Sequence, residues 1–212
     1  YRNWSKIRYR SIEHVINELL EVKKELPNIE RINFYDEVFS PQEEWAREMF
    51  FQYRHLVGLP FYCMFYPGSC DEDTAKLLKE SGLQGVWLGI QSGSERVRRE
   101  IFKRYYTNKT ILKQAEIFKN YDINVRYDFI FDNPFETKEE TRESIELMRQ
   151  LPKPCSFNMF SLKYFPNTDI TNMALKRKVI TQSDIDKQLA YDYQYYLISK
   201  EHQKEIERLI HE

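Results

Sequence analysis

Apolar and polar positions along this chain follow two periods, one typical of helices and one typical of strands. In residues 11–26 the apolar side chains recur every three or four positions, which predicts an amphipathic helix. In residues 85–90 nearly every position is apolar, which is typical of a strand covered on both faces of a parallel sheet. The two kinds of segment alternate. The predicted strands are 32–35, 61–66, 85–90, 123–131 and 157–164, and the predicted helices are 11–26, 40–57, 69–82, 95–103, 108–120, 137–151 and 168–177.

Several predicted helices begin with residues that satisfy free backbone N–H groups. Residues 40–43, Ser-Pro-Gln-Glu, combine an N-cap serine, a proline in the first turn and a glutamate three positions after the serine. Ser69 with Glu72, and Thr137 with Glu140, have the same spacing. These residues predict where the second, third and sixth helices start.

Strands that alternate with helices predict an α/β fold, in which a mostly parallel sheet is built with right-handed crossovers. Periodicity alone does not distinguish a barrel from an open sheet. A mild break in the pattern falls near residues 178–185. We therefore expect one compact domain, residues 1–178, and a C-terminal helical extension, residues 179–212.

Composition excludes several classes of function. The net charge of −1 does not suggest a nucleic-acid partner, and no apolar run approaches the ~20 residues that cross a bilayer. The three cysteines, Cys63, Cys70 and Cys155, are odd in number and widely spaced, which argues against a disulfide framework and for a reducing compartment. We expect a cytoplasmic protein whose cysteines are buried or loop thiols.

Candidate chemistry gathers where the predicted strands end, because the carboxyl edge of a parallel α/β barrel holds its active site. Gln91, Ser92, Gly93 and Ser94 follow the most apolar strand. The amide and the hydroxyls offer the paired donors and acceptors that a sugar diol needs, and Gly93 lets the backbone come close to a ligand. The alternative is that Ser94 is a plain helix N-cap and that Gln91 points outward.

An acid interrupts the next apolar strand. Asp128 is costly there unless it is paired or hydrogen-bonded, and Arg126, which lies in line on the same strand, does not suit as its partner. An inward carboxylate that accepts ribose hydroxyls would satisfy it. Asp132, Asn133 and Pro134 then turn the chain, and the proline favours an extended Asn133.

The first strand ends in Asp36 and Glu37, which could bind a cation or a ligand amine, or could form a solvated turn before the next helix. The histidines, by contrast, are predicted to lie on helices away from the strand ends, which weakens hydrolase and zinc-enzyme hypotheses. They are His14, His55, His202 and His211.

A basic segment follows the Gln91–Ser94 turn. Arg98 and Arg99 are expected on a solvated helix face, as is usual for a run of charges. Lys103 and Arg104 lie near the end of that helix and could return over the strand ends to meet a carboxylate.

Taken in order and spacing, these segments resemble the radical S-adenosylmethionine (SAM) superfamily. The resemblance is strongest to the branch whose members often carry a cobalamin-binding domain ahead of the radical domain, and it covers about residues 5–178. The segments that carry it are 34–39, 59–61, 66–67, 77–82, 89–97, 128–137 and 165–168.

The resemblance implies a partial (β/α)6 barrel that cleaves SAM reductively at a [4Fe-4S] cluster and forms a 5′-deoxyadenosyl radical. It implies SAM, the cluster and, for methyl transfer, cobalamin as cofactors. It also implies a small-molecule or peptide substrate and a reductase or ferredoxin-type electron donor. By the same resemblance, Gln91 and Asp128 would contact the ribose of SAM, and Ser92 and Gly93 would line its methionine side. Lys103, or Arg104 in its place, would bind the methionine carboxylate. Asn133 and Pro134 would pass near the adenine.

The cysteine loop that holds the family's cluster, Cys-x3-Cys-x2-Cys, does not occur in the 212 residues. We expect it, with the first strand, upstream of Tyr1, because Tyr1-Arg2 begins in mid-motif; the alternative is a cluster-free binding module. Residues 132–135, Asp-Asn-Pro-Phe, also stand where many relatives have Gly-Leu-Pro-Gly. A non-radical lyase or isomerase that uses Asp36, Glu37 and Asp128 is the other hypothesis.

Overall fold

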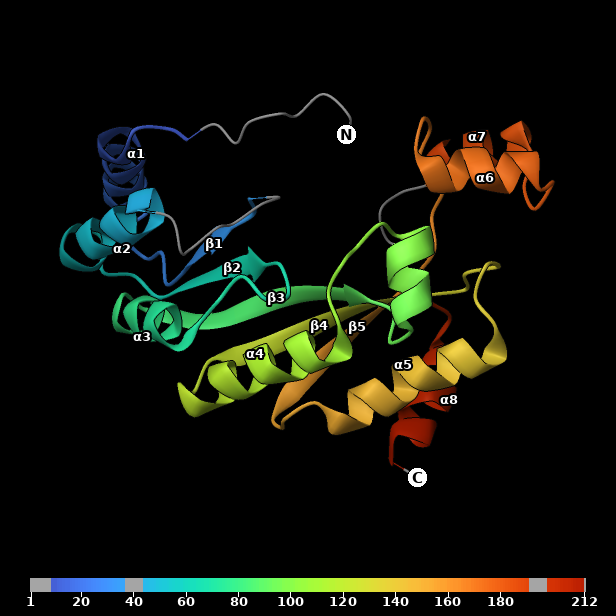
Figure 1. Cartoon of the computed structure of the whole chain (residues 1–212). Coiled ribbons are helices and arrows are strands. Elements are labelled where there is room, and N and C mark those ends of the chain that lie inside the picture. The colour runs from blue at the N-terminus through green and yellow to red at the C-terminus, as the bar shows by residue number, and fades with distance from the viewer. Residues whose placement is uncertain (1–8, 37–43, 191–197, 212) are drawn as a thin grey trace.

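The computed structural model of the chain describes residues 9–36, 44–190 and 198–211. Five parallel strands form one open sheet in the order β1-β2-β3-β4-β5, so strands that follow one another in the sequence are neighbours in space (Figure 1). This confirms the predicted α/β fold and is consistent with a partial TIM-like barrel. The strands are β1 (Ile32–Phe34), β2 (Phe61–Phe65), β3 (Leu83–Gln91), β4 (Asn124–Phe131) and β5 (Cys155–Ser161).

Helices α3, α4 and α5 run along one face of the sheet, whereas α6 and α7 lie beyond the end to which the strands point (Figure 1). A short π-helix, η1, follows β3 at that same end. The helices are α1 (Ile12–Glu25), α2 (Glu44–Leu56), α3 (Glu72–Glu80), η1 (Val97–Ile101), α4 (Asn108–Asn120), α5 (Lys138–Gln150), α6 (Asp169–Lys176), α7 (Gln182–Ala190) and α8 (Lys200–His211). Among the described residues, no helix has the length and apolar character needed to cross a bilayer.

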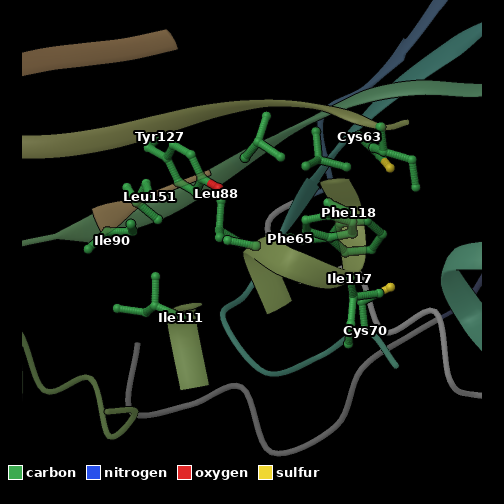
Figure 2. Packing of buried hydrophobic residues seen from close by; sticks show 14 of the residues in the cluster. Cys63, Phe65, Cys70, Leu88, Ile90, Ile111, Ile117, Phe118, Tyr127 and Leu151 are labelled. Carbon is green, nitrogen blue, oxygen red and sulfur yellow. The ribbon is translucent and has the colours of Figure 1, made fainter. Parts of the chain in front are cut away.

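The main core lies between the sheet and the helices that cover it, including α3, α4 and α5. Figure 2 shows Leu88 and Ile90 of β3 and Tyr127 of β4 close to Ile111 and Phe118 of α4, and all five are buried. Leu88 and Ile90 occupy alternate positions of β3, because successive side chains of a strand point to opposite faces.

The opposite face of the sheet is partly exposed, and we call it the open face. It carries the alternate strand positions, including Trp87 and Gly89 of β3 and Arg126 and Asp128 of β4, of which Arg126 is exposed and the other three are half-buried. The expectation that strand 85–90 is covered on both faces is therefore wrong for the described part of the chain. The open face can accept a ligand or another segment.

A second, smaller core covers the carboxyl edge of the sheet. It joins Val97 and Ile101 of η1 to Phe135, in the loop after β4, and to Ala174 of α6. The C-terminal extension reaches the main core, because Ile198 and Ile206 are buried in it. The part of the extension that carries Ile198 and Ile206 is thus packed against the sheet domain.

The predicted helix starts are partly corrected. The pairing of Ser69 with Glu72 is wrong: the N-cap of α3 is Asp71, whose carboxylate accepts a hydrogen bond from the Thr74 amide at 2.9 Å. The Ser69 hydroxyl donates to a carbonyl in the preceding turn instead. The capping box of Thr137 and Glu140 is confirmed, and residues 40–43 lie outside the described ranges.

Candidate functional site

Asp128 lies on the open face of β4, and its partner is Asn158 of β5. The two residues are opposite each other in the sheet, and Asn158 Nδ2 donates to Asp128 Oδ1 at 2.8 Å. Burial raises the pKa of Asp128 above its usual value, while the Asn158 hydrogen bond and the charge of Arg126 oppose this rise. The second oxygen, Oδ2, has no hydrogen-bond partner among the described residues, so it remains available to a ligand. Sequence reasoning did not identify Asn158, although an amide inside an apolar strand was a usable signal.

Gln91 is on the open face beside Asp128. Its φ of 73° is left-handed, and the register of β3 against β4 shifts between Gly89 and Gln91. The side chain therefore lies back over Gly89, where an added Cβ would come within 2.6 Å of Gln91 Nε2. Because Gly89 is opposite Asp128 in the sheet, the amide and the carboxylate occupy the same region of the open face. The alternative of an outward Gln91 does not fit this geometry.

Ser92 and Gly93, in contrast, are turned toward α5. The Ser92 hydroxyl donates to Glu136 Oε1 at 2.9 Å, and the Gly93 amide donates to Ser144 Oγ at 2.7 Å. A Cβ on Gly93 would lie 2.4 Å from the carbonyl oxygen of Glu143. The close approach that requires this glycine is thus to a helix rather than to a ligand, so we leave Ser92 and Gly93 out of the candidate methionine site.

The helix-capping role that we considered for Ser94 is present. Its hydroxyl accepts a hydrogen bond from the Val97 amide at 3.5 Å and donates to Glu140 Oε1 at 3.2 Å. Ser94 therefore links the start of η1 to the start of α5.

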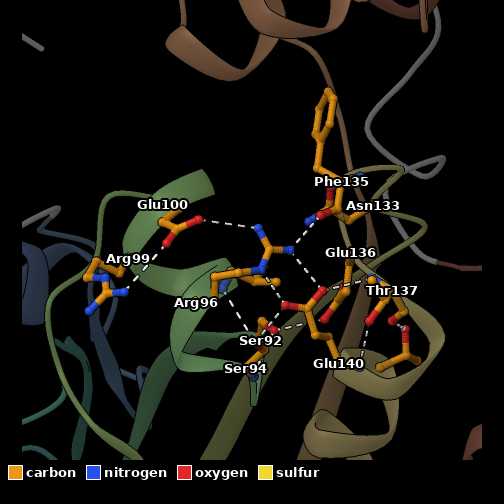
Figure 3. A network of polar contacts seen from close by, with 12 residues as sticks. Ser92, Ser94, Arg96, Arg99, Glu100, Asn133, Phe135, Glu136, Thr137 and Glu140 are labelled. Carbon is orange, nitrogen blue, oxygen red and sulfur yellow. Dashed lines mark hydrogen bonds and ion pairs between the residues drawn. The ribbon is translucent and has the colours of Figure 1, made fainter.

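An ion pair fastens the first turn of α5 to the segment after β3 (Figure 3). Arg96 donates from Nε to Glu140 Oε1 at 2.5 Å and from Nη2 to Glu140 Oε2 at 2.8 Å, and Nη2 also reaches the carbonyl of Phe135 at 2.9 Å. Glu140 accepts the Thr137 amide as well, at 2.8 Å. The hydrogen bonds from Arg96 lower the pKa of Glu140 to about 2. This network holds the ends of β3 and β4 in one arrangement.

Glu136, in the loop after β4, is affected in the opposite direction. Burial raises its pKa to about 7, and the neighbouring charges of Glu140 and Glu143 add to the rise, whereas the hydrogen bond from Ser92 opposes it. Close to neutral pH this carboxyl group therefore exists in both protonation states.

Arg98 does not lie on a solvated helix face, so that expectation was wrong. Its side chain is 0% exposed, and it donates from Nη1 to the carbonyl of Ser92 at 2.5 Å and from Nε to the carbonyl of Tyr106 at 3.4 Å. The wider π-helical turn, marked by the bond from Phe102 N to Val97 O, accompanies this inward position. Arg99 is exposed, as the charge run predicts.

Of the two basic residues proposed for a carboxylate, Arg104 is nearer the strand ends. Its guanidinium lies 5.9 Å from the ring centroid of Tyr66, directly after β2, and the Tyr66 ring packs edge-on at 5.0 Å against Tyr106. The Tyr106 hydroxyl in turn donates to the carbonyl of Gly89 at 2.9 Å. Lys103 is exposed. The geometry favours Arg104 over Lys103.

Asn133 is buried at the end of β4 and has an unused donor. Its Oδ1 accepts the Phe135 amide at 3.1 Å, but Nδ2 has no partner among the described residues. A buried unpaired donor of this kind costs roughly 1–3 kcal/mol, which a ligand acceptor would recover. Pro134, the next residue, is exposed.

The remaining strand-end residues add one correction. Asp36 is exposed after β1, and Glu37 lies outside the described ranges. The prediction that His202 lies away from the strand ends is wrong. Its Nδ1 lies 3.3 Å from Asp132 Oδ1, and its ring packs near Phe131. Helix α8 brings it there from 70 residues along the chain, a contact that no local pattern predicts.

The cysteines do not fit an iron–sulfur cluster. Cys63 and Cys70 are buried free thiols, Cys155 is partly buried, and burial raises the pKa of Cys70 to about 12, which disfavours the thiolate that binds iron. Within residues 9–36, 44–190 and 198–211, no three histidine, cysteine or acidic side chains are placed to hold a metal ion. The described residues therefore supply no ligand set for a [4Fe-4S] cluster.

Comparison with known proteins decides the family. The model of the Radical SAM superfamily matches residues 1–148. This chain belongs to the radical SAM superfamily. The family implies SAM and a [4Fe-4S] cluster as cofactors, and it is a family of enzymes that use an electron donor.

Individual relatives are longer than this chain. Cytidylyl-2-hydroxyethylphosphonate methyltransferase from Streptomyces wedmorensis is 26% identical over 187 residues, which cover 85% of this chain and 34% of that protein. The chain spans about a third of the length of the curated relatives that it matches.

Solved structures share the fold. The radical SAM methyltransferase TsrM from Kitasatospora setae, with cobalamin and a [4Fe-4S] cluster bound, has a TM-score of 0.67 at 21% identity, over 79% of this chain and 34% of that one. The cobalamin-dependent SAM radical enzyme OxsB has a TM-score of 0.54 at 18% identity, over 85% of this chain and 27% of that one.

Proposed function

We propose that the carboxyl edge of β3 and β4 binds SAM, and that this chain is the SAM-binding part of a radical SAM enzyme. The observation that carries the proposal is the shared position of Gln91 and Asp128 on the open face. Gln91 offers a side-chain amide and Asp128 offers its second carboxylate oxygen, Oδ2, because Oδ1 already accepts the bond from Asn158; neither the amide nor Oδ2 is hydrogen-bonded within the described residues. A ribose diol needs such a pair.

The other contacts follow from the groups available at the same edge. Arg104 would bind the methionine carboxylate, since a guanidinium matches a carboxylate in geometry and charge. The free Nδ2 of Asn133 would donate to a ring nitrogen of adenine. Pro134 would continue the same loop past the base. These residues would bind SAM, orient it and keep its ribose fixed on the sheet.

The reaction that we propose for the enzyme is that of its family, reductive cleavage of SAM to methionine and a 5′-deoxyadenosyl radical. A [4Fe-4S] cluster would supply the electron for this cleavage, the residues named above would hold SAM, and a reductase or ferredoxin-type protein in the cytoplasm would be the electron donor. Relatives that are named methyltransferases, and the likeness to TsrM and OxsB, support methyl transfer with cobalamin as the overall outcome.

Asp128→Asn tests the ribose contact. The asparagine can still accept the hydrogen bond from Asn158, so the sheet should fold, but the charge-assisted bond to the sugar is lost. We expect SAM binding to weaken by roughly ten- to a hundredfold, about 1.4–2.8 kcal/mol, by titration calorimetry on the intact enzyme.

Asp122→Asn is the matched control, because Asp122 lies before the other end of β4 with an exposed side chain. It should leave the SAM dissociation constant unchanged. If Asp128→Asn bound SAM as tightly as this control, Asp128 would not belong to the site. If the wild-type enzyme failed to bind SAM at all, the lyase or isomerase hypothesis would replace the proposal.

A further inference from the structure

A cavity opens on the open face of the sheet, nearer the amino ends of the strands than the proposed ribose contacts. Its volume is about 370 Å³. None of the ten residues that line it is acidic, whereas two are arginines and two are aromatic. The side chains that matter here are Arg31, Tyr62, Trp87, Arg126 and Ser156.

The two arginines give the cavity a positive charge that the chain does not neutralise. The Arg31 guanidinium lies over the ring of Tyr62 at 5.0 Å, and Arg126 donates from Nε to Ser156 Oγ at 3.3 Å. Neither has a carboxylate within ion-pair distance in the part of the chain that the structure describes. Asp128, two residues from Arg126, is near enough for Arg126 to lower its pKa but is not paired with it.

An aromatic surface forms the floor. The Tyr62 ring lies against the sheet at Gly85, where an added Cβ would come within 2.5 Å of Tyr62 Cε1, so glycine is what admits the ring. Trp87 follows at 5.5 Å from Tyr62, and Tyr35 stacks on Trp87 at 5.6 Å with planes 21° apart. A flat apolar group can lie on such a surface.

The cavity is one layer of side chains away from the proposed ribose contacts. Trp87 precedes Gly89 by two residues, and Arg126 precedes Asp128 by two, so each pair is separated by roughly 7 Å along its strand. A molecule that fills the cavity would therefore end one layer of side chains from the proposed ribose contacts, and a group that projects from it along the open face would reach the sugar of SAM.

We propose that this cavity binds the substrate, and that the substrate carries a carboxylate or phosphate next to a flat ring. The anion would lie between Arg31 and Arg126, and the ring would lie on Tyr62 and Trp87. As a substrate site this rests on the proposed function, but as a site for a flat anion it stands on its own residues.

Phenyl phosphate, benzoate, inorganic phosphate and benzylamine are the probes, titrated calorimetrically into the intact enzyme. We expect the enzyme to bind phenyl phosphate or benzoate, whichever matches the natural anion better. Inorganic phosphate and benzylamine should bind at least fivefold more weakly than that aromatic anion. Arg31→Gln and Arg126→Gln should each weaken binding about tenfold, the lower end for a charge-assisted hydrogen bond. Arg142→Gln, at a side chain that is 73% exposed on α5, is the control and should bind like the wild type.

Three results would overturn the proposal. The first is an equal loss of aromatic-anion binding in all three arginine variants. The second is binding of inorganic phosphate as tight as that of the aromatic anions, and the third is binding of benzylamine as tight as that of the aromatic anions. Thermal melts confirm that the variants fold. The SAM dissociation constant separates this proposal from the previous one, because Arg31→Gln should leave it unchanged. Loss of aromatic-anion binding in Arg31→Gln, together with normal SAM binding by Asp128→Asn, would keep the anion site and refute only the ribose assignment.

Discussion

Two neighbouring carboxyl groups, one in the loop after β4 and one in the first turn of α5, show how position decides charge at the level of single residues. Glu140 is surrounded by donors from Ser94, Arg96 and Thr137, and its pKa falls to about 2. Glu136 has one hydroxyl donor, from Ser92, and its pKa rises to about 7 because burial dominates. The start of α5 therefore carries a fixed charge, and the loop before it carries one that titrates near neutrality.

Glu136→Gln should remove a pH dependence of stability. The folded pKa of Glu136, about 7, exceeds its value of 4.5 in an unfolded chain, so its stabilising contribution is complete below pH 4.5 and is lost as pH rises through 7. As pH rises from 4.5 to 7.5, we expect the free energy of unfolding of the variant to increase by about 1–3 kcal/mol relative to that of the wild type, as measured by urea unfolding.

Glu139→Gln, at an exposed position three residues further on in the first turn of α5, is the control and should give a constant difference from the wild type over this range. A constant difference for Glu136→Gln as well would mean that the carboxyl group is solvated in the folded protein.

Sequence reasoning succeeded at residues whose chemistry conflicts with their surroundings. Asp128 stood out because an acid in an apolar strand needs a partner, and the structure supplies Asn158. The burial of Arg98 was not predicted, because a run of charged residues on a helix usually lies on a solvent-exposed face. Its burial depends on the π-helical turn and on carbonyl groups at a strand end, which a single sequence does not reveal.

At the level of elements, the joint between β3 and α5 positions the candidate site. Gly93 lies directly against the backbone of α5, and its amide hydrogen-bonds to Ser144. The same contact fixes where β3 ends and hence where Gln91 leaves the strand. A shift of α5 would therefore move the ribose contacts.

Gly93→Ala should destabilise the fold by about 3 kcal/mol or more, because the new Cβ would lie 2.4 Å from backbone atoms of α5 that cannot move aside separately. Gly58→Ala is the matched control. Its φ of 64° is strained for alanine, but the nearest atom is 3.6 Å away, so we expect a loss of about 1 kcal/mol. Urea denaturation measures both, and similar losses for the two variants would exclude a close β3–α5 joint.

Most helices and strands could be predicted because their hydrophobic residues recur with a clear period, whereas the ends of these elements depend on single contacts. The five strands and the helix after Thr137 were predicted within a few residues. The start of α3 was placed at Ser69 rather than Asp71, since either side chain can cap a helix and only the backbone path decides between them. The open face was not predicted, because an apolar run does not say how many sides of a strand are covered.

For the whole molecule, the position of the C-terminal extension matters most. The sequence places a boundary near residue 178, yet α8 packs beside α5 and the sheet. Arg149 of α5 donates from Nε to the Leu209 carbonyl at 3.0 Å, and His202 approaches Asp132 at the end of β4. We therefore expect the extension to unfold together with the sheet domain.

Ile206→Ala tests this expectation. Ile206 is 2% exposed and belongs to the main core, so truncation removes buried methyl groups and leaves a cavity that the sheet and α5 cannot fill. We expect a loss of about 2–4 kcal/mol in a single cooperative urea transition, because two-state unfolding transmits the local loss to the entire domain. Val179→Ala, at a side chain that is 43% exposed, should cost less than about 0.5 kcal/mol. If Ile206→Ala instead produced a separate early transition and left the main one at the wild-type midpoint, α8 would be an independent appendage, and its histidine would not help to hold the loop after β4.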